Sequence, residues 1–529
     1  MYSRWPGLLA VEALAFVCLY MVCLYSVVEP RWETNDDIAM SMVAHGYGIA
    51  AVSSPTIVFS NVIWGYIVTG FPAIGAIPGY SAATIGVLVL VASFLYWLVV
   101  RNGYGRTTAV LVIALVFTRP FVYPQFTLNS GLLCIGAFMA LHRFKSERNM
   151  AYALIAVLMA TLSFLVRSQE FLLVALVSMP LLPWRAFLVD RALRATLLLI
   201  TIIVVSAAAL DVMAYRTADW AFYNDLNPLR AAFTDFSASD AVKAHAAVLA
   251  KYKFTVNDIE LLRNWFFADR SIADPAALRG ILSDIGVVEL RSSALSDGYY
   301  GLSLMFGIRL LPLMIVAAAA AILFTDWRLL FSLASVIALG LIISALGRLD
   351  TLRIYEPLLA LTVVALLVQT ADLRPLRRVW LCVVAVAAVV TVWAVTETSL
   401  RQQTSVNVAR ESSQILDGSQ VVLWGAGLPL EAIYPVLDRQ EFKRPVALYS
   451  LGTFTWAPFS VAYDRQRAGQ GLVEQLRSDQ GIWIIGTGAN FQSLEIYCRE
   501  HFGADLEEIE HRAQGPVRIS RRRCTKTAG

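Results

Sequence analysis

The stretch PGLLAVEALAFVCLYMVCLYSVV, residues 6–28, is a long apolar run with almost no charge. Arg4 precedes it, and the polar run EPRWETNDD follows it from residue 29. A helix of about 20 apolar residues spans the hydrocarbon core of a bilayer, which is about 30 Å thick. The run is too long for the core of a signal peptide, and it lacks a small-x-small cleavage site. We therefore expect a retained first helix that crosses a membrane.

The rest of the chain repeats this pattern. Of its 529 residues, 58% are hydrophobic and only 16% are charged, and the mean hydropathy is +0.62. This apolar content is well above that of an ordinary soluble protein, so it needs lipid and not a larger core. Ten further stretches are apolar enough to cross as helices, near residues 81–100, 107–118, 125–141, 150–166, 170–183, 195–215, 301–324, 329–346, 355–371 and 379–396. The sequence therefore predicts a polytopic α-helical membrane protein with about eleven spans.

The placement of arginine and lysine predicts the orientation of the spans. With eleven spans, the short segments on the N-terminal side of the membrane carry most of the positive residues. By the positive-inside rule, the N-terminus is then inside and the C-terminus outside. A further apolar stretch, 57–78, is broken by glycines and two prolines. If it crossed, the orientation of every later span would be reversed, and most of the positive residues would lie outside, against the positive-inside rule. We therefore expect an interfacial helix on the outer face.

This topology leaves three sizeable outer segments. Residues 1–396 are expected to form a transmembrane domain that carries two of them, a first outer loop at 29–80 and an outer insertion at 216–299. The insertion alternates polar and apolar residues at helical spacing, as in DAVKAHAAVLAKY and PAALRGILSDIG. It therefore predicts a small helical cap.

The third outer segment is the tail, residues 397–529, which is expected to be a periplasmic α/β domain. Strand-like VVLWG and GIWIIG alternate there with helix-like segments at 470–479 and 491–502. Cys498 and Cys524 lie in this tail and can form a disulfide if it faces an oxidising compartment. The other four cysteines sit in apolar spans, where a cysteine usually acts as a small buried hydrophobe.

Four polar side chains follow the first span directly, at the mouth of the membrane: Glu33, Asn35, Asp36 and Asp37. Adjacent carboxylates on an irregular segment can act as a general base and its orienting partner, because each raises the proton affinity of the other. The alternative is a helix N-cap, since Asn or Asp before IAMSMVA is a good capping residue. On spacing alone, the cap is the commoner arrangement.

Five arginines stand at the outer ends of later helices, against the positive-inside bias: Arg119, Arg167, Arg309, Arg348 and Arg353. Polar residues accompany them in VRSQE, which contains Gln169 and Glu170, and in GRLDTLRIYEP, which contains Asp350, Tyr355 and Glu356. A guanidinium group binds phosphate through two parallel hydrogen bonds, and phosphate binding would explain why arginines lie on this side of the membrane. The alternatives are snorkelling to headgroups and ion pairs, Arg167 with Glu170 or Arg353 with Glu356. The convergence of the whole set with two aspartates favours a site.

A metal or nucleotide site is not expected from the sequence. The five histidines are scattered, and none pairs with another at ligand spacing. His45 is the only one near the acidic loop.

These features together resemble a known superfamily. An inward-starting span, the acidic motif ETNDD, an interfacial helix, about eleven spans and an outward C-terminal domain resemble the GT-C glycosyltransferases. The arrangement is most similar to the bacterial branch related to protein mannosyltransferases and aminoarabinose transferases. The resemblance covers residues 1–396 and is architectural. The chain departs from the closest subfamilies in having Asn-Asp-Asp in place of an Asp-Glu type of pair, and in its insertion.

The resemblance implies a function. In that superfamily a first-loop carboxylate activates the acceptor, which attacks the anomeric carbon of a polyprenyl-phosphate sugar. Asp36 or Asp37 would then be the catalytic base, and the expected substrate contacts are Glu33, Asn35, Arg119, Arg167, Gln169, Glu170, Arg309, Arg348, Arg353 and Tyr355. No cofactor is expected beyond the lipid-linked donor, and a divalent metal stays open.

The resemblance also implies a location and partners. The chain would lie in a bacterial inner membrane, with its active site and C-terminal domain facing the periplasm. Its partners would be membrane lipids, a polyprenyl-phosphate sugar and a glycan, lipid or protein acceptor, without nucleic acid. Other functions stay open from the sequence: a transporter or flippase of lipid-linked glycans, a polymerase or ligase of such glycans, and a non-catalytic envelope-assembly protein.

Overall fold

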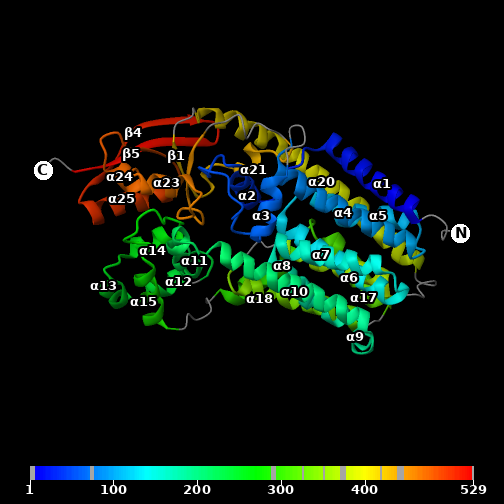
Figure 1. Ribbon diagram of the computed structural model, residues 1–529. Coiled ribbons are helices and arrows are strands. Elements are labelled where there is room, and N and C mark those ends of the chain that lie inside the picture. Colours follow the sequence, from blue (N-terminus) through cyan, green and yellow to red (C-terminus); the bar gives the residue numbers. More distant parts are fainter. Residues whose placement is uncertain are drawn as a thin grey trace.

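The computed structural model describes residues 6–71, 77–236, 238–286, 293–324, 327–348, 352–369, 377–416, 420–437 and 446–526. Arg4 and Asp350, which the sequence analysis names, lie outside these ranges. Long helices run side by side through one end of the molecule, and shorter helices and a sheet form the other end (Figure 1). The N-terminus lies at the far end of the helical bundle, and the C-terminus lies at the tip of the other part.

Each of the eleven predicted spans corresponds to a helix of the bundle. In chain order these are α1 (Pro6–Val27), α4 (Gly79–Arg101), α5 (Arg106–Val122), α6 (Phe126–Glu147), α7 (Met150–Val166), α8 (Ser168–Ser178), α10 (Arg191–Ala214), α17 (Leu311–Phe324), α18 (Trp327–Ala345), α19 (Leu352–Gln369) and α20 (Arg377–Ser412). A short turn of helix, η1 (Met179–Leu181), and α9 (Trp184–Val189) connect α8 to α10. The helical class is confirmed, whereas the number of crossings and their orientation remain predictions.

The outer surface of the bundle requires a lipid environment. Among the described residues, five helices are long and apolar enough to cross a membrane: Gly7–Val27, Gly79–Arg101, Arg191–Ala214, Trp327–Ala345 and Arg378–Ile415. Three shorter helical segments, Met150–Val166, Ser168–Leu181 and Leu311–Leu323, are also apolar. Along α10 the side chains of Leu198, Ile202 and Val205 are exposed. A continuous apolar surface of this kind is stable against hydrocarbon and not against water.

The structure corrects three details of the predicted spans. The stretch 301–324 is two helices, because α16 (Ala294–Met305) ends before Phe306 and α17 starts only at Leu311. The helix predicted at 107–118 does not stop at Pro120 but continues to Val122. Pro120 cannot donate a hydrogen bond to the carbonyl of Val116, but the helix continues past it, because the N–H of Tyr123 bonds to the carbonyl of Arg119 at 2.7 Å. Helix α20 also continues beyond the predicted end of its span, through Ser412.

Two helices form the described part of the first outer loop, α2 (Asn35–His45) and α3 (Val62–Gly70). Helix α3 confirms that 57–78 contains a helix, although residues 72–76 lie outside the described part of the chain. The side chain of Asn61 caps it by accepting a hydrogen bond from Ile63 N. Asp211 of α10 accepts a hydrogen bond from Val62 N at 2.7 Å, so α3 is docked against a long helix of the bundle.

The insertion is helical, as its spacing predicts. It contains η2 (Ala218–Trp220), α11 (Ala221–Thr234), α12 (Ala238–Lys243), α13 (Ala246–Tyr252), α14 (Val256–Arg263) and α15 (Pro275–Ile285). Local sequence explains two of the helix starts. Thr255 and Asp258 form a reciprocal capping box at the start of α14. Asp274 accepts from the first N–H groups of α15, and Pro275 takes the first helical position, where no N–H is needed.

The tail contains a five-stranded sheet in the order β2-β1-β3-β5-β4. The strands are β1 (Val421–Trp424), β2 (Leu448–Leu451), β3 (Ile482–Ile485), β4 (Asp505–Gln514) and β5 (Val517–Thr525). Strand β1 pairs in parallel with β2 and β3, whereas β5 is antiparallel to β3 and β4. Its helices are α21 (Leu430–Ile433), α23 (Val461–Arg467), α24 (Leu472–Leu476) and α25 (Gly488–Phe502). The predicted strands and helices are therefore present.

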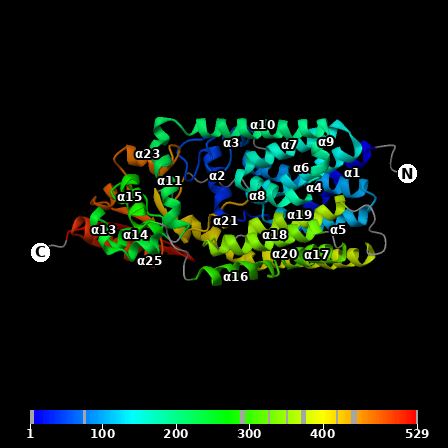
Figure 2. The ribbon, with the colours of Figure 1, turned by 90° about the horizontal axis from the view of Figure 1, so that it is seen from below.

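Hydrogen bonds join the three outer segments into one layer, in which the insertion and the sheet of the tail lie together at one end of the molecule (Figure 2). The first outer loop bonds to the tail through its backbone, where Leu448 N donates to Gly48 O at 2.9 Å and Val461 N donates to Ile49 O at 2.9 Å. The insertion bonds to the tail through indole groups, and Trp424 Nε1 donates to the carbonyl of Asn264 at 2.6 Å. The tail is thus fixed against both other segments.

The orientation of this layer can be tested with reporter fusions. Fusions after Arg148 and Arg194 should report the cytoplasm, because both positions follow the positively charged inner ends of helices. Fusions near Asp258 and after Gly529 should report the outside. A cytoplasmic signal from the C-terminal fusion would overturn the predicted topology.

The tail contains a disulfide between Cys498 of α25 and Cys524 of β5, with Cα atoms 5.7 Å apart. On the chain-entropy model, closing a loop of this length stabilises the folded state by about 3 to 4 kcal/mol. Maleimide should therefore label neither thiol in the denatured, unreduced protein, and it should label both after reduction. Free reaction of both cysteines before reduction would rule the bond out.

Candidate active site

The acidic motif lies in the first turn of α2. Thr34 is the N-cap residue, although its side chain makes no capping hydrogen bond, and the helix begins at Asn35. Asp36 and Asp37 are therefore inside the helix, so neither is the N-cap that the sequence allowed, and the segment is not irregular. Carboxylates in a first turn interact favourably with the positive end of the helix dipole. Their environments, however, differ sharply.

Asp37 is completely buried and acts as an anchor. Its Oδ1 accepts hydrogen bonds from the Tyr80 hydroxyl and from Phe126 N, both at 3.0 Å, and Oδ2 accepts from the Thr34 hydroxyl at 3.4 Å. Burial, followed by the negative charge of Asp36, raises the pKa of Asp37 well above its usual value. The side chain therefore ties α2 to α4 and α6, and it has no face open to a substrate.

Asp36 is the accessible member of the pair. Its Oδ2 accepts a hydrogen bond from Nη1 of Arg353 at 3.1 Å, and both side chains are 30% exposed. Arg353 lies in the first turn of α19. The ion pair holds the Asp36 carboxylate in one orientation while leaving part of it open to solvent. Asn35, the next residue toward the N-terminus, is exposed.

Arg119 is buried between two carboxylates beside this pair. Its side chain is 5% exposed, with Nη2 bonded to Glu33 at 2.5 Å and Nη1 bonded to Glu356. Glu356 follows Arg353 by three residues on α19, so the two side chains are neighbours on one face of the helix. The ion pair that the sequence suggested between Arg353 and Glu356 is not formed. Each takes a partner from another element, so an ion network of Glu33, Arg119 and Glu356 lies one helical turn of α19 from the pair of Asp36 and Arg353.

Arg167 and Glu170 extend the charged region between α7 and α8. Arg167 donates to the carbonyl of Phe59 at 3.1 Å, and its guanidinium lies 5.0 Å from the ring centroid of Phe126. Burial, and then the positive charge of Arg353, lower the pKa of Arg167 to about 10, whereas Asp36 and Glu170 act in the opposite direction. Arg167 is therefore within electrostatic reach of the Asp36 pair. Glu170 is buried, and its Oε1 makes no hydrogen bond within the part of the chain that the structure describes.

Three other predicted residues lie away from this cluster. Arg348 points toward the insertion and pairs with Asp235 at 3.5 Å. Tyr355 is fully buried, with its hydroxyl 3.0 Å from Ser344 Oγ of α18, so it serves the packing of two helices. Gln169 is exposed and accepts a hydrogen bond from the neighbouring Ser168. The structure thus brings together the acidic motif, Arg119 and Arg353, with Arg167 and Glu170 close by.

A cavity of about 460 Å³ adjoins the network. It lies between the segment that follows α1, the turn between α16 and α17, the outer half of α20, and the tail. Its polar wall includes Arg31, Glu33, Arg119 and Arg309, and its apolar wall includes Ile308, Ala394, Val395, Val406, Ala409 and Ala432. Because Glu33 and Arg119 belong to both the cavity and the ion network, the two are contiguous.

The sequence analysis did not single out Arg31 as a site residue. Arg31 is buried, and Nη2 donates to the carbonyl and hydroxyl oxygens of Ser399 at 2.7 and 2.6 Å, while Nε has no hydrogen-bond partner among the described residues. Its outward position directly after the first span was the signal that could have found it. Arg309 is exposed at the cavity, and no hydrogen bond or ion pair joins it to another described residue. For the part of the cavity wall that α20 contributes, the sequence offered no signal beyond apolar composition.

Comparison with known proteins adds one finding about the fold. No protein-family model matches the chain, and no curated protein matches it. Its structure is similar to the crystal structure of ArnT from Cupriavidus metallidurans bound to undecaprenyl phosphate. The TM-score is 0.41 and the sequence identity 10%, over 99% of this chain and 98% of that chain. At this TM-score and identity, the function of the chain has to be argued from its own side chains.

Proposed function

We propose that the chain is a glycosyltransferase that moves a sugar from a polyprenyl phosphate to an acceptor at the outer surface of the membrane. Asp36 carries this proposal. It is a partly exposed carboxylate, oriented by Arg353, at the outer ends of the helices. Only one helical turn of α19 separates its partner from the ion network that borders the cavity. A general base, a source of positive charge and an open space are therefore neighbours.

The cavity suits the phosphate end of a lipid carrier. Its volume is within the range of about 300–1,000 Å³ that is usual for ligand pockets. Apolar side chains of α20 and the tail can contact the first isoprene units, while Arg31 and Arg309 offer positive charge to the phosphate. Arg119 lines the same wall, but Glu33 and Glu356 already neutralise its charge. Arg309 is therefore the arginine best able to bind the donor.

The proposed reaction is a single displacement at the anomeric carbon. Asp36 takes the proton of an acceptor hydroxyl as its oxygen forms a bond to the anomeric carbon. The bond between that carbon and the phosphate oxygen breaks, and the polyprenyl phosphate leaves with the electron pair. Arg309 and Arg31 stabilise the negative charge that grows on the phosphate. The lipid supplies an activated donor, so the reaction needs no soluble nucleotide sugar.

Location and partners follow from this chemistry as part of the proposal. The enzyme would act at the periplasmic face of a bacterial inner membrane, with a glycan, lipid or protein as the acceptor. A ligase or polymerase of lipid-linked glycans would use the same donor class but would depend on arginines as its main catalytic groups. The accessible, oriented carboxylate of Asp36 favours a base-assisted transfer instead.

Substitutions of the two aspartates should affect different properties, sugar transfer for Asp36 and stability for Asp37. Asp36→Asn should lower sugar transfer by about 10²-fold or more, because a positioned base is lost. Its thermal unfolding should stay near that of the wild type, since the side chain is partly solvated. Asp37→Ala should instead cost about 1–3 kcal/mol of stability, because the Tyr80 hydroxyl and the Phe126 N–H lose their buried acceptor. Transfer from a radiolabelled polyprenyl-phosphate sugar and thermal unfolding in detergent measure the two effects. Wild-type transfer by Asp36→Asn would refute the proposed base.

Arg309→Ala should weaken binding of the donor without unfolding the protein. Loss of one charge-assisted hydrogen bond to phosphate corresponds to about a tenfold rise in the dissociation constant for polyprenyl phosphate. Equilibrium binding to the purified protein measures this change. Arg401→Ala is the matched control, because Arg401 lies on α20, is 77% exposed and pairs with Glu397. If both variants bind the lipid as tightly as the wild type, the cavity is not the phosphate site.

A further inference from the structure

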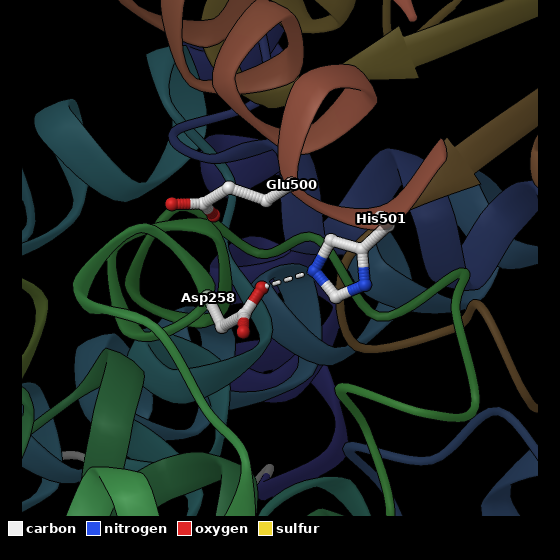
Figure 3. A group of neighbouring side chains, drawn as sticks. All are labelled: Asp258, Glu500 and His501. Atoms are coloured by element: carbon white, nitrogen blue, oxygen red, sulfur yellow. Dashed lines mark hydrogen bonds and ion pairs between the residues drawn. The ribbon is translucent and has the colours of Figure 1, made fainter. Parts of the chain in front are cut away.

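Two helices from distant parts of the chain meet in the outer layer, away from the cavity. Asp258 lies in the first turn of α14 of the insertion, and Glu500 and His501 lie in the last turn of α25 of the tail. Figure 3 shows the carboxylate of Asp258 and the imidazole of His501 pointing toward one another, with Glu500 beside them. The nitrogen and oxygen atoms that the three side chains offer all lie within 4.8 Å of one another.

Hydrogen bonds already orient these side chains. Asp258 Oδ1 is 2.8 Å from His501 Nε2, and its Oδ2 accepts from the backbone N–H of Thr255 at 2.9 Å. The Thr255 hydroxyl donates to Glu500 Oε2 at 2.8 Å. The Asp258 side chain is only 2% exposed, whereas the His501 side chain is 24% exposed. A cation would replace the proton shared by Asp258 Oδ1 and His501 Nε2, while the backbone donor keeps Oδ2 in place, as hydrogen bonds do for the carboxylate ligands of metal sites.

Further contacts fix the two helices that carry these residues. On one side of α25, the disulfide between Cys498 and Cys524 holds the helix to β5. On the other side, Asn257 Nδ2 of α14 donates to the carbonyl of Ser493 of α25 at 3.0 Å. The His501 ring also packs against Tyr497, with 4.6 Å between centroids. The three side chains are thus held close together before any ligand arrives.

The surroundings favour a cation. The carboxylates of Asp258, Asp269 and Glu500 all direct negative charge at the imidazole of His501. The negative end of the α25 dipole lies at the same place. Three carboxylates thus act on a single imidazole, and one of them is buried.

We infer that Asp258, Glu500 and His501 bind one divalent transition-metal cation, for which Zn²⁺ is the best chemical match. Zinc accepts one imidazole nitrogen and two carboxylate oxygens with a water as its fourth ligand, at about 2.0–2.2 Å. Calcium and magnesium prefer sites built from oxygen alone. Ligand atoms around tetrahedral zinc are about 3.3 Å apart, so the Asp258–His501 pair would open by about half an ångström. The cation joins the insertion to the tail and takes no part in sugar transfer.

Zinc binding to the purified full-length protein tests this inference directly. The free thiols are first blocked with N-ethylmaleimide, and bound metal is removed with EDTA and gel filtration. Titration of ZnCl₂ against a chromophoric chelator should then show one bound equivalent, with a higher midpoint of thermal unfolding. His501→Gln and Glu500→Gln should each weaken binding by about tenfold or more. Glu495→Gln is the matched control, because Glu495 lies on the same helix and pairs with Arg499.

The outcomes separate clearly. One equivalent of zinc that is lost in both ligand variants and kept in Glu495→Gln supports the site. Equal binding by the wild type and His501→Gln, or no binding by the wild type, overturns it, and the three residues are then only a hydrogen-bonded contact between two segments. The measurement does not use sugar transfer, so its result is independent of the proposed enzymatic function.

Discussion

The arrangement at the outer ends of the helices depends on the neutralisation of one buried charge. Arg119 is almost without solvent, and a guanidinium in that position costs several kcal/mol unless carboxylates compensate it. Glu33 comes from the segment after α1, and Glu356 comes from α19, so the compensation joins three parts of the chain that are far apart in sequence. Arg353 is then aligned with Asp36, because it lies one turn before Glu356 on the same helix.

The two adjacent aspartates illustrate how environment separates residues of the same type. Asp37 is surrounded by hydrogen-bond donors and apolar side chains, and its role is to fix the first turn of α2. Asp36, one residue earlier, points toward Arg353 and solvent. One residue of a helix turns the side-chain direction by about 100°, which is enough to place one carboxylate in the core and the other at its edge. The buried anchor therefore sets the position of the accessible group.

The tail is part of the wall of the cavity and is not an independent appendage. Ala432 of α21 and Pro516 line the same cavity as Arg119. Arg410, near the end of α20, bonds to both carboxylate oxygens of Glu29 and to the carbonyl of Ala432. Helix α20 continues from the bundle into the tail without a break, so one helix belongs to both. Hydrogen bonds between the insertion and the tail, such as the one from Trp424 to the carbonyl of Asn264, hold the outer layer together away from the cavity.

The sequence by itself determined the membrane class, the positions of the long helices, and the strands and helices of the tail. These are local properties, because apolar runs of fixed length and alternating patterns follow from neighbouring residues. It also indicated the acidic motif, which directly follows the first span, and the arginines at outer helix ends, which oppose the positive-inside bias. Only the tertiary structure decided which aspartate is accessible, which carboxylates neutralise Arg119, and that α20 and the tail enclose a cavity with Arg31. It likewise brought Asp258 to His501, where histidine spacing predicted no metal site. Such pairings join residues that are far apart in the sequence, from 86 positions for Glu33 and Arg119 to 317 for Asp36 and Arg353. A one-dimensional pattern contains no information about which distant charges will share one buried space.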